Sequence, residues 1–276
     1  MSGKLYLVGT PIGNLDDFSP RGLDTLKGAD FIAAEDTRVT LKLLSRFDIH
    51  KPLVSYYEHN KYSSGDKIFQ RISAGETCAL VTDAGMPAIS DPGEDIVRMC
   101  AENGVEVYTV PGPSALISAL ALSGLPTGRF TFEGFLSTAS KSRREHLESL
   151  RGEERTMIFY EAPHKLLKTL SDLVGAFGPD RPVSVCRELT KIHEDVLRTT
   201  LSGALRHFNE IPPKGEFVLV VAGKPVDSSP SATAEEAMVL VDTYRTEGLS
   251  LREACKRAAA DTGFSKNELY SMALEK

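Results

Sequence analysis

Apolar and polar positions alternate along the first part of the chain in one repeated order. Short apolar runs rich in β-forming residues stand at residues 4–9, 31–38, 78–85 and 105–112. Each run is followed by polar or glycine-containing residues and then by helical spacing. Ser19 and Pro20 fit the N-cap and first residue of the first helix. This order predicts α/β units that build a mostly parallel sheet.

A second series of apolar runs follows Gly124. Its members stand at residues 130–136, 156–163, 182–189 and 216–223, again with helical spacing between them. Two successive sets of strands are more than one doubly wound domain usually carries. We therefore predict the α/β class, with an N-terminal α/β domain over residues 1–123 and a C-terminal α/β domain over residues 124–224. The two domains are expected to face each other across a cleft.

The pattern changes again after Lys224. The segment PVDSSPSAT is typical of a linker, and helical spacing continues from there to the end of the chain. Three S/T-x-x-E capping boxes predict three short helices, and they pair Thr233 with Glu236, Ser250 with Glu253, and Ser265 with Glu268. Gly248 and Gly263 stand where helices should stop. Residues 225–276 are thus predicted to be a linker and a small helical tail.

Composition narrows the class of protein. The four cysteines are widely spaced and form no CxxC pair, which favours reduced structural thiols and no metal site. The N-terminal apolar run is too short for a signal peptide, and the stretch at 114–125 is shorter than the roughly 20 residues of a membrane span. We expect a cytoplasmic protein without membrane contact. A net charge of -6 argues against indiscriminate nucleic-acid binding, so an RNA partner would need local basic patches.

The stretch TDAGMPAISDPG at 82–93 concentrates glycine, proline and acidic residues directly after a predicted buried strand. Asp83 falls at the carboxyl end of that strand, where open α/β sheets bind ligands. A carboxylate there accepts hydrogen bonds from amines or hydroxyls and repels phosphate, which favours a cationic or polyhydroxyl ligand. A purely structural loop, with Asp91 or Ser90 capping the next helix, fits the spacing equally well. Ser114 in VPGPSAL is a similar N-cap candidate at the same sheet edge.

TDAGMPAISDPG also resembles the signature of the ribosomal RNA small-subunit methyltransferase I (RsmI) family, and it meets every constrained position of that signature. Further segments resemble the family in the same order: PIGNL at 11–15, AAEDTR at 33–38, VPGPSA at 110–115, FEGFL at 132–136, YEAPHK at 160–165, RELTK at 187–191 and KGEFVLVV at 214–221. The resemblance covers residues 4–224, and the tail resembles the family's helix-turn-helix appendix.

The resemblance implies a tetrapyrrole-methylase-like fold, S-adenosylmethionine in the cleft and commonly a homodimer. It also implies 2′-O-methylation of a cytidine in the decoding region of 16S rRNA in the small ribosomal subunit. The implied cofactor contacts are Pro11, Asp83, Ala84, Gly85, Met86, Ile89, Ser114, Ala115, Tyr160, Glu161, Lys214, Gly215 and Glu216. One departure is Gly85-Met86-Pro87, where other enzymes of this fold tend to have Gly-Asp-Pro, and this weakens the case for a corrin or porphyrin substrate.

Methyl transfer to a ribose hydroxyl needs a general base, or a cation that stabilises the developing alkoxide. The candidates at expected strand ends are Glu35, Asp36, Glu161, Glu188 and Lys191. We favour Glu188 as the base with Lys191 or Arg187 as its cationic partner, because all three lie in one short segment. An exposed ion-pair cluster on a loop explains these three residues about as well.

RNA contacts are expected from local basic residues. The candidates are Arg38, Lys42, Arg143, Arg144 and Lys165 in the body and Lys256, Arg257 and Lys266 in the tail. A solvated helix face is the alternative for the densest run, KSRREH at 141–146, and a helical cap or dimer contact is the alternative for the tail. Two other functions stay open: a non-catalytic RNA-binding or ribosome-assembly factor of the same fold and, with less support, a small-molecule methylase.

Overall fold

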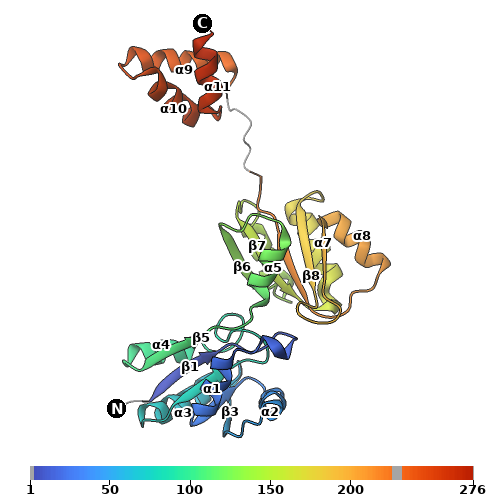
Figure 1. Ribbon diagram of the computed structural model, residues 1–276. Coiled ribbons are helices and arrows are strands. Elements are labelled where there is room, and N and C mark those ends of the chain that lie inside the picture. Colours follow the sequence, from blue (N-terminus) through green and yellow to red (C-terminus); the bar gives the residue numbers. More distant parts are fainter. Residues whose placement is uncertain (1–2, 226–231, 276) are drawn as a thin grey trace. The chain divides into compact units, whose positions relative to one another are not determined.

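The computed structural model describes residues 3–225 and 232–275, which belong to two units that divide between Lys224 and Pro225 (Figure 1). The first unit contains two five-stranded sheets, and the second contains three helices. Most of the expected linker, residues 226–231, lies outside the described residues.

The first sheet is wholly parallel, as predicted for the first series of apolar runs. It contains β1 (Lys4–Val8), β2 (Phe31–Ala34), β3 (Leu53–Ser55), β4 (Cys78–Val81) and β5 (Glu106–Val110) in the order β3-β2-β4-β1-β5. Every residue of β2 and β4 is buried, because helices cover both faces of the sheet. The sequence pattern does not predict β3, a three-residue edge strand whose residues are only half-buried.

Helices pack on both faces of this sheet. α1 (Pro20–Gly28) and α2 (Thr37–Arg46) bury Leu26 and Leu44 against one face, while α3 (Lys61–Ser73) and α4 (Glu94–Glu102) bury Ile68 and Ile96 against the other. The Ser19 side chain caps α1 and Pro20 is its first residue, as predicted. The short 3-10 helix η1 (Leu15–Asp17) lies between β1 and α1.

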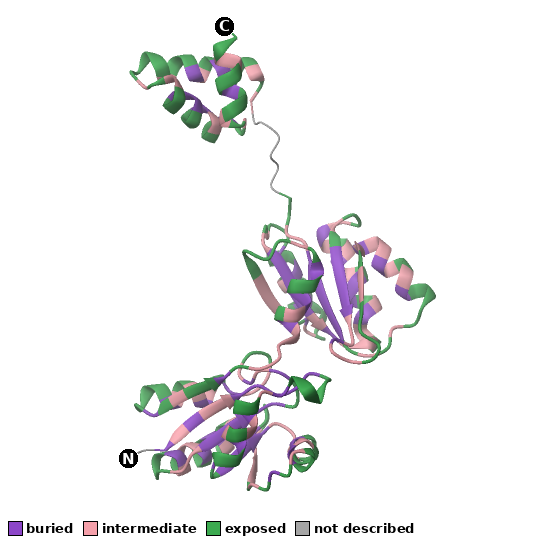
Figure 2. Ribbon diagram, viewed as in Figure 1, coloured by how far each residue is buried: buried purple, intermediate pink, exposed green. Residues whose placement is uncertain are grey.

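The second sheet is mixed. Its strands are β6 (Phe130–Phe135), β7 (Thr156–Glu161), β8 (Pro182–Arg187), β9 (Asp195–Thr200) and β10 (Phe217–Val221), in the order β6-β7-β10-β8-β9. β6 and β7 are parallel, and the other neighbours are antiparallel. The sequence pattern does not predict β9, an edge strand with no buried residue. Figure 2 shows the central strands of this sheet as buried.

Four helices surround the second sheet. α7 (Leu166–Phe177) and α8 (Leu201–Glu210) share one apolar core with it, to which α6 (Ser140–Ser149) contributes Leu147. The short 3-10 helix η2 (Pro163–Lys165) precedes α7. α5 (Ala115–Ser123) packs on the opposite face, where Leu116 and Leu120 contact the sheet.

The position of α5 bears on the domain boundary. Although it follows the last strand of the first sheet, its buried residues belong to the core of the second sheet. The boundary at residue 124 stays a prediction, and we propose the connection 111–114 as the alternative.

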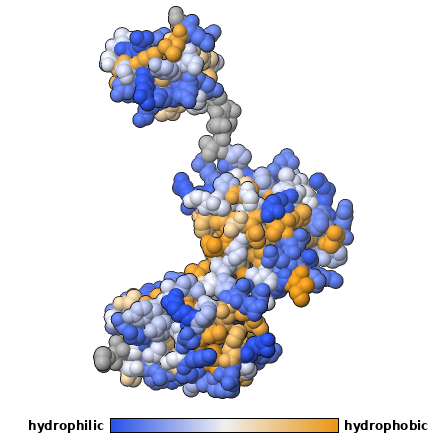
Figure 3. All heavy atoms as spheres, in the orientation of Figure 1, coloured by the Kyte–Doolittle hydropathy of each residue, from blue (hydrophilic) through white to orange (hydrophobic). Residues whose placement is uncertain are grey.

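The second unit has its own core, formed by Ala237, Val241, Ala258 and Leu269 among others. Its helices are α9 (Ala234–Thr246), α10 (Leu251–Thr262) and α11 (Lys266–Leu274), with the predicted N-caps Thr233, Ser250 and Ser265. The capping boxes at Thr233 and Ser265 are complete, whereas Glu253 bonds to the Ser250 hydroxyl. Hydrophilic residues cover most of its visible surface (Figure 3).

All four cysteines are free and buried. Among the described residues no helix combines the length and the apolar character that crossing a membrane requires. Within the same ranges, no group of three or more histidine, cysteine, aspartate or glutamate residues is arranged to hold a metal ion.

Candidate functional site

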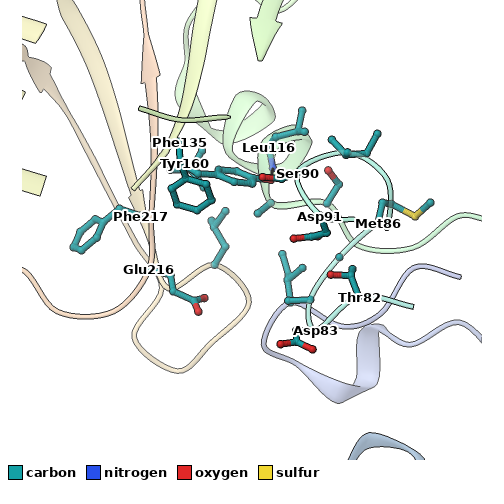
Figure 4. A pocket seen from close by; sticks show the side chains of 18 of the residues that line it. Thr82, Asp83, Met86, Ser90, Asp91, Leu116, Phe135, Tyr160, Glu216 and Phe217 are labelled. Carbon is teal, nitrogen blue, oxygen red and sulfur yellow. Dashed lines mark hydrogen bonds between the residues drawn. The ribbon is translucent and has the colours of Figure 1, made fainter. Parts of the chain in front are cut away.

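A pocket of about 430 Å³ lies where loops of the first sheet meet strand ends of the second (Figure 4). The first sheet contributes the segment that follows β4, and the second contributes the ends of β6, β7 and β10. The residues that line it are Ile12, Glu35, Thr82, Asp83, Ala84, Gly85, Met86, Ile89, Ser90, Asp91, Ser114, Ala115, Leu116, Phe135, Tyr160, Glu161, Ala162, Pro163, Leu189, Glu216, Phe217 and Val218.

Strand order explains why the pocket lies at this edge. β4 and β1 are neighbours in the sheet although they are far apart in sequence, so the loops at their carboxyl ends meet at a point where connections diverge. Thr10 and Gly85 form a backbone bridge there, and the Thr10 hydroxyl donates to the carbonyl of Thr82 at 3.1 Å. Gly85 has φ +89°, a conformation that favours glycine. These contacts fix the segment from Thr82 to Met86.

The first-sheet wall of the pocket is acidic. Glu35 accepts hydrogen bonds from the Thr82 hydroxyl at 2.7 Å and from the Asp83 N–H at 3.4 Å, and Asp83 accepts from the Asp36 N–H at 3.1 Å. Burial raises the pKa of Asp83, and the charges of Glu35 and Asp36 raise it further. Such a wall favours a cationic group in the pocket.

Asp91 extends this acidic wall, and in Figure 4 its carboxylate points into the pocket. Burial raises the pKa of Asp91 to about 6, and the charges of Glu35 and Asp83 raise it as well. The prediction that Asp91 or Ser90 caps the next helix is wrong. The N-cap of α4 is Gly93, where φ is +153° and a Cβ would lie 2.7 Å from that of Ala88.

The opposite wall is aromatic. The rings of Phe132 and Phe135 meet the Tyr160 ring edge to face, with centroid distances of 5.0 and 5.6 Å. The Tyr160 hydroxyl accepts a hydrogen bond from the N–H of Leu116 at 3.1 Å, and burial raises the pKa of this tyrosine. The second-sheet side of the pocket therefore adds an aromatic surface to the acidic wall of the first sheet, which suits a ligand that combines an aromatic ring with a cation.

The structure brings together ten of the thirteen residues expected to contact a cofactor: Asp83, Ala84, Gly85, Met86, Ile89, Ser114, Ala115, Tyr160, Glu161 and Glu216. Pro11, Lys214 and Gly215 lie outside the lining. Ser114 occupies the N-cap position of α5, but its side chain makes no capping hydrogen bond.

Thr82, Ser90 and Asp91 also line the pocket; they lie within TDAGMPAISDPG, but the sequence pattern does not predict them as ligand contacts. Phe135 and Val218 lie in the motifs FEGFL and KGEFVLVV, but only the packing of the two sheets brings them to the loop after β4.

The three catalytic candidates do not line the pocket, although Leu189 and Glu216 beside them do. Lys191 Nζ lies 2.9 Å from Glu188 Oε1 and 2.9 Å from Glu216 Oε2, and Glu188 also accepts from the Glu216 N–H at 2.9 Å. The hydrogen bond from Lys191 lowers the pKa of Glu188. Arg187 contributes a buried Nε with no hydrogen-bond partner among the described residues.

The candidate RNA contacts differ in accessibility. Lys42 and Arg144 are exposed, Lys165 is half-buried, and Arg38 is exposed but paired with Asp36 at 2.6 Å. The structure corrects the prediction for Arg143, which is only 6% exposed and whose guanidinium is hydrogen-bonded to Asp172 and Thr169 instead of being free for RNA.

In the tail, Lys256 and Lys266 line one hollow together with Ser250, Arg252 and Glu253. The guanidinium of Arg257 lies over the ring of Tyr244, 4.7 Å from its centroid. α10 and α11 thus place three cationic side chains, Arg252, Lys256 and Lys266, around one surface depression.

Comparisons with known proteins agree with this architecture. A family model described as Tetrapyrrole (Corrin/Porphyrin) Methylases matches residues 4–204, and a model described as RsmI C-terminal HTH domain matches residues 231–276. Similar solved structures include a diphthine synthase, with TM-score 0.63, 17% identity and coverage of 80% of this chain and 90% of that one. Another is a uroporphyrin-III-C-methyltransferase from Thermus thermophilus, with TM-score 0.56, 19% identity and coverage of 79% and 94%. At these identities they show the fold alone.

Curated relatives that carry the name ribosomal RNA small subunit methyltransferase I include proteins from three bacteria. The protein from Synechocystis sp. is 48% identical, and the match covers 99% of this chain and 98% of the relative. The Bacillus subtilis protein is 46% identical, with coverage of 97% and 93%. The Thermotoga maritima protein is 48% identical, and its match covers 99% of that relative but 80% of this chain.

Proposed function

The chain belongs to the ribosomal RNA small subunit methyltransferase I family, and on this premise we propose that it uses S-adenosylmethionine to methylate the 2′-oxygen of a cytidine in the decoding region of 16S rRNA. The observation that carries the proposal is the pocket with an acidic wall opposite an aromatic wall, at the strand ends of an α/β sheet. Relatives named for ribosomal RNA methylation support the substrate class.

The lining residues fit this cofactor. Its sulfonium and ammonium groups are cations that Asp83 and Asp91 would attract, and its adenine ring would lie against the aromatic wall of Tyr160 and Phe135. When bound, the cofactor supplies an electrophilic methyl group. The cofactor contacts expected at Pro11, Lys214 and Gly215 stay predictions.

The chain's own contribution is alignment and proton removal. Methyl transfer is an in-line displacement, so the pocket must hold the ribose oxygen opposite the leaving sulfur. A base that works near neutral pH needs a pKa near that pH. Asp91, which lines the pocket and whose pKa burial raises, meets this requirement better than Glu188, which lies outside the lining and whose pKa Lys191 lowers. We propose Asp91 as an alternative base, and Glu188 with Lys191 or Arg187 stays a prediction.

Transfer of labelled methyl groups tests the proposal. S-adenosylmethionine is incubated with the protein and, separately, purified small subunits, naked 16S rRNA or a mixture of tetrapyrroles, and the modified nucleotide is then mapped. We expect incorporation into RNA at one cytidine ribose. Cofactor-independent RNA binding with no incorporation would favour an assembly factor, and incorporation into tetrapyrroles alone would favour a small-molecule methylase.

The setting of the reaction is part of the proposal. We propose a cytoplasmic enzyme that works as a homodimer on the small ribosomal subunit. Light scattering after gel filtration measures the oligomeric state, and a mass of one chain at micromolar concentration would overturn the homodimer.

A further inference from the structure

Arg143 on α6 is the first member of a buried series of hydrogen bonds that ends at the pocket. Its Nε donates to Asp172 Oδ2 at 2.5 Å, and its Nη2 donates to the hydroxyl of Thr169 at 2.8 Å. The Thr169 hydroxyl in turn donates to Glu161 Oε2. Glu161 lines the pocket and also accepts from the N–H of Ala162 at 2.8 Å. Two helices, α6 and α7, and one strand, β7, are therefore joined in one network of hydrogen bonds.

The chemistry of these groups fixes the direction of every bond. A guanidinium can only donate, so the Thr169 oxygen must accept from Arg143. An ionised carboxylate can only accept, so the single hydroxyl hydrogen of Thr169 is directed to Glu161. Arg143 thus prevents the hydroxyl from turning away toward a carbonyl of its own helix, which is the usual alternative for a threonine inside a helix.

Burial makes this arrangement costly unless it is complete. Thr169 is 0% exposed, Glu161 is 3% exposed and Arg143 is 6% exposed. Charged and polar groups are expensive in such surroundings when a partner is missing. Each carboxylate oxygen of Glu161 receives one hydrogen bond from the protein, which leaves acceptor capacity on a side chain that lines the pocket.

We propose that Arg143 and Thr169 are positioning residues, which hold the Glu161 carboxylate so that it accepts a hydrogen bond from an amine or hydroxyl of the bound cofactor. This inference rests on the proposed function, because it concerns the same pocket. It also gives Arg143 a role other than RNA contact.

Cofactor affinity measured by calorimetry tests this role. Thr169→Val keeps the shape of the side chain but removes the hydrogen donor, so the dissociation constant of S-adenosylmethionine should rise about tenfold. S-adenosylhomocysteine has the same amine and hydroxyl donors without the sulfonium charge, and its dissociation constant should rise by the same factor. Thr169→Ser restores the hydroxyl and should restore both affinities. A smaller rise is expected for Asp172→Asn, because Asp172 is partly exposed and bonds to Arg143, not to Thr169.

Arg143→Met and Arg144→Met form the matched pair for the RNA alternative. Both arginines lie on α6 and line the same outer groove, but only Arg143 reaches Thr169. We expect Arg143→Met to weaken cofactor binding with unchanged affinity for 16S rRNA, and Arg144→Met to leave cofactor binding unchanged.

Two results would overturn the inference. One is a Thr169→Val or Asp172→Asn protein that melts at a lower temperature yet binds cofactor as the wild type does at a temperature where both are folded. The other is a loss of RNA affinity in Arg143→Met with normal cofactor binding. If the wild-type protein binds neither S-adenosylmethionine nor S-adenosylhomocysteine, the proposed function fails and this inference fails with it.

Discussion

At the scale of single residues, Asp91 is the group that links the pocket to pH. Burial raises its pKa to about 6 in the free protein, and a cationic ligand would favour the ionised form and lower that pKa. Cofactor binding should therefore release a proton near pH 6, and affinity should rise as the pH increases from 5 to 7. Calorimetry at pH 6 in buffers of different ionisation enthalpy measures the proton release, and Asp91→Asn should abolish it.

The same group affects the stability of the ligand-free protein. The folded pKa of about 6 lies above the ordinary aspartate value of 3.8, so the folded state binds more protons than the unfolded state between these pH values. The contribution of Asp91 to the free energy of unfolding is fully present below pH 4 and is lost as the pH rises through 6. Asp91→Asn should thus be more stable than the wild type at pH 7, by about 1 kcal/mol. The raised pKa would be contradicted if the wild-type and Asp91→Asn proteins had equal free energies of unfolding at both pH 4 and pH 7.

Glu188 allows a direct test of two mechanisms. If it is the general base, Glu188→Gln abolishes turnover and leaves cofactor affinity intact. We expect instead that turnover falls less than about tenfold. The amide keeps an oxygen that can accept from the Glu216 N–H, and the carboxylate is a weak base while Lys191 holds it. Single-turnover rates distinguish the two mechanisms, and a thousandfold loss with normal cofactor affinity would identify Glu188 as the base.

At the scale of elements, Gly9 and Gly112 explain how β1 and β5 deliver their loops to one site. A Cβ on Gly112 would lie 2.8 Å from the Cα of Gly9, and a backbone atom cannot move out of the way by changing rotamer as a side chain can. Gly112→Ala should lower stability by about 1–3 kcal/mol and weaken cofactor binding, because Ser114 and Ala115 follow directly. Gly128→Ala is the control, since nothing lies within 4 Å of its Cβ. Equal melting temperatures and affinities for both variants would refute the close contact.

The elements also show what a sequence can predict. The parallel first sheet and the three tail helices follow from strong local signals: buried apolar runs such as CALV in β4, and capping boxes such as Ser265 with Glu268. β3 and β9 lack such signals, because edge strands bury few residues. The pocket was predictable where its residues lie in one loop, as Asp83 to Met86 do. The position of Phe135 in the pocket and the burial of Arg143 depend on contacts between residues far apart in the sequence, so no local sequence pattern predicts them.

At the scale of the whole molecule, each unit buries its own core, so the first unit should fold and bind cofactor without the second. Deleting residues 230–276 should leave cofactor affinity and the melting of the first unit unchanged. Calorimetry of the truncated and full-length proteins measures both quantities. A truncated protein that no longer binds cofactor would show that the tail supports the pocket.

The tail's contribution should appear in RNA binding and in its dependence on salt. Arg252, Lys256 and Lys266 surround one hollow, and each cation that contacts a phosphate adds about 0.7 to the slope of log affinity against log salt for single strands. Replacing all three by alanine should weaken binding to 16S rRNA and reduce that slope by about 2. Binding titrations between 50 and about 200 mM salt measure the slope. Val239→Ser, at an exposed apolar position of α9, is the control; an unchanged slope in the triple variant would make the tail structural.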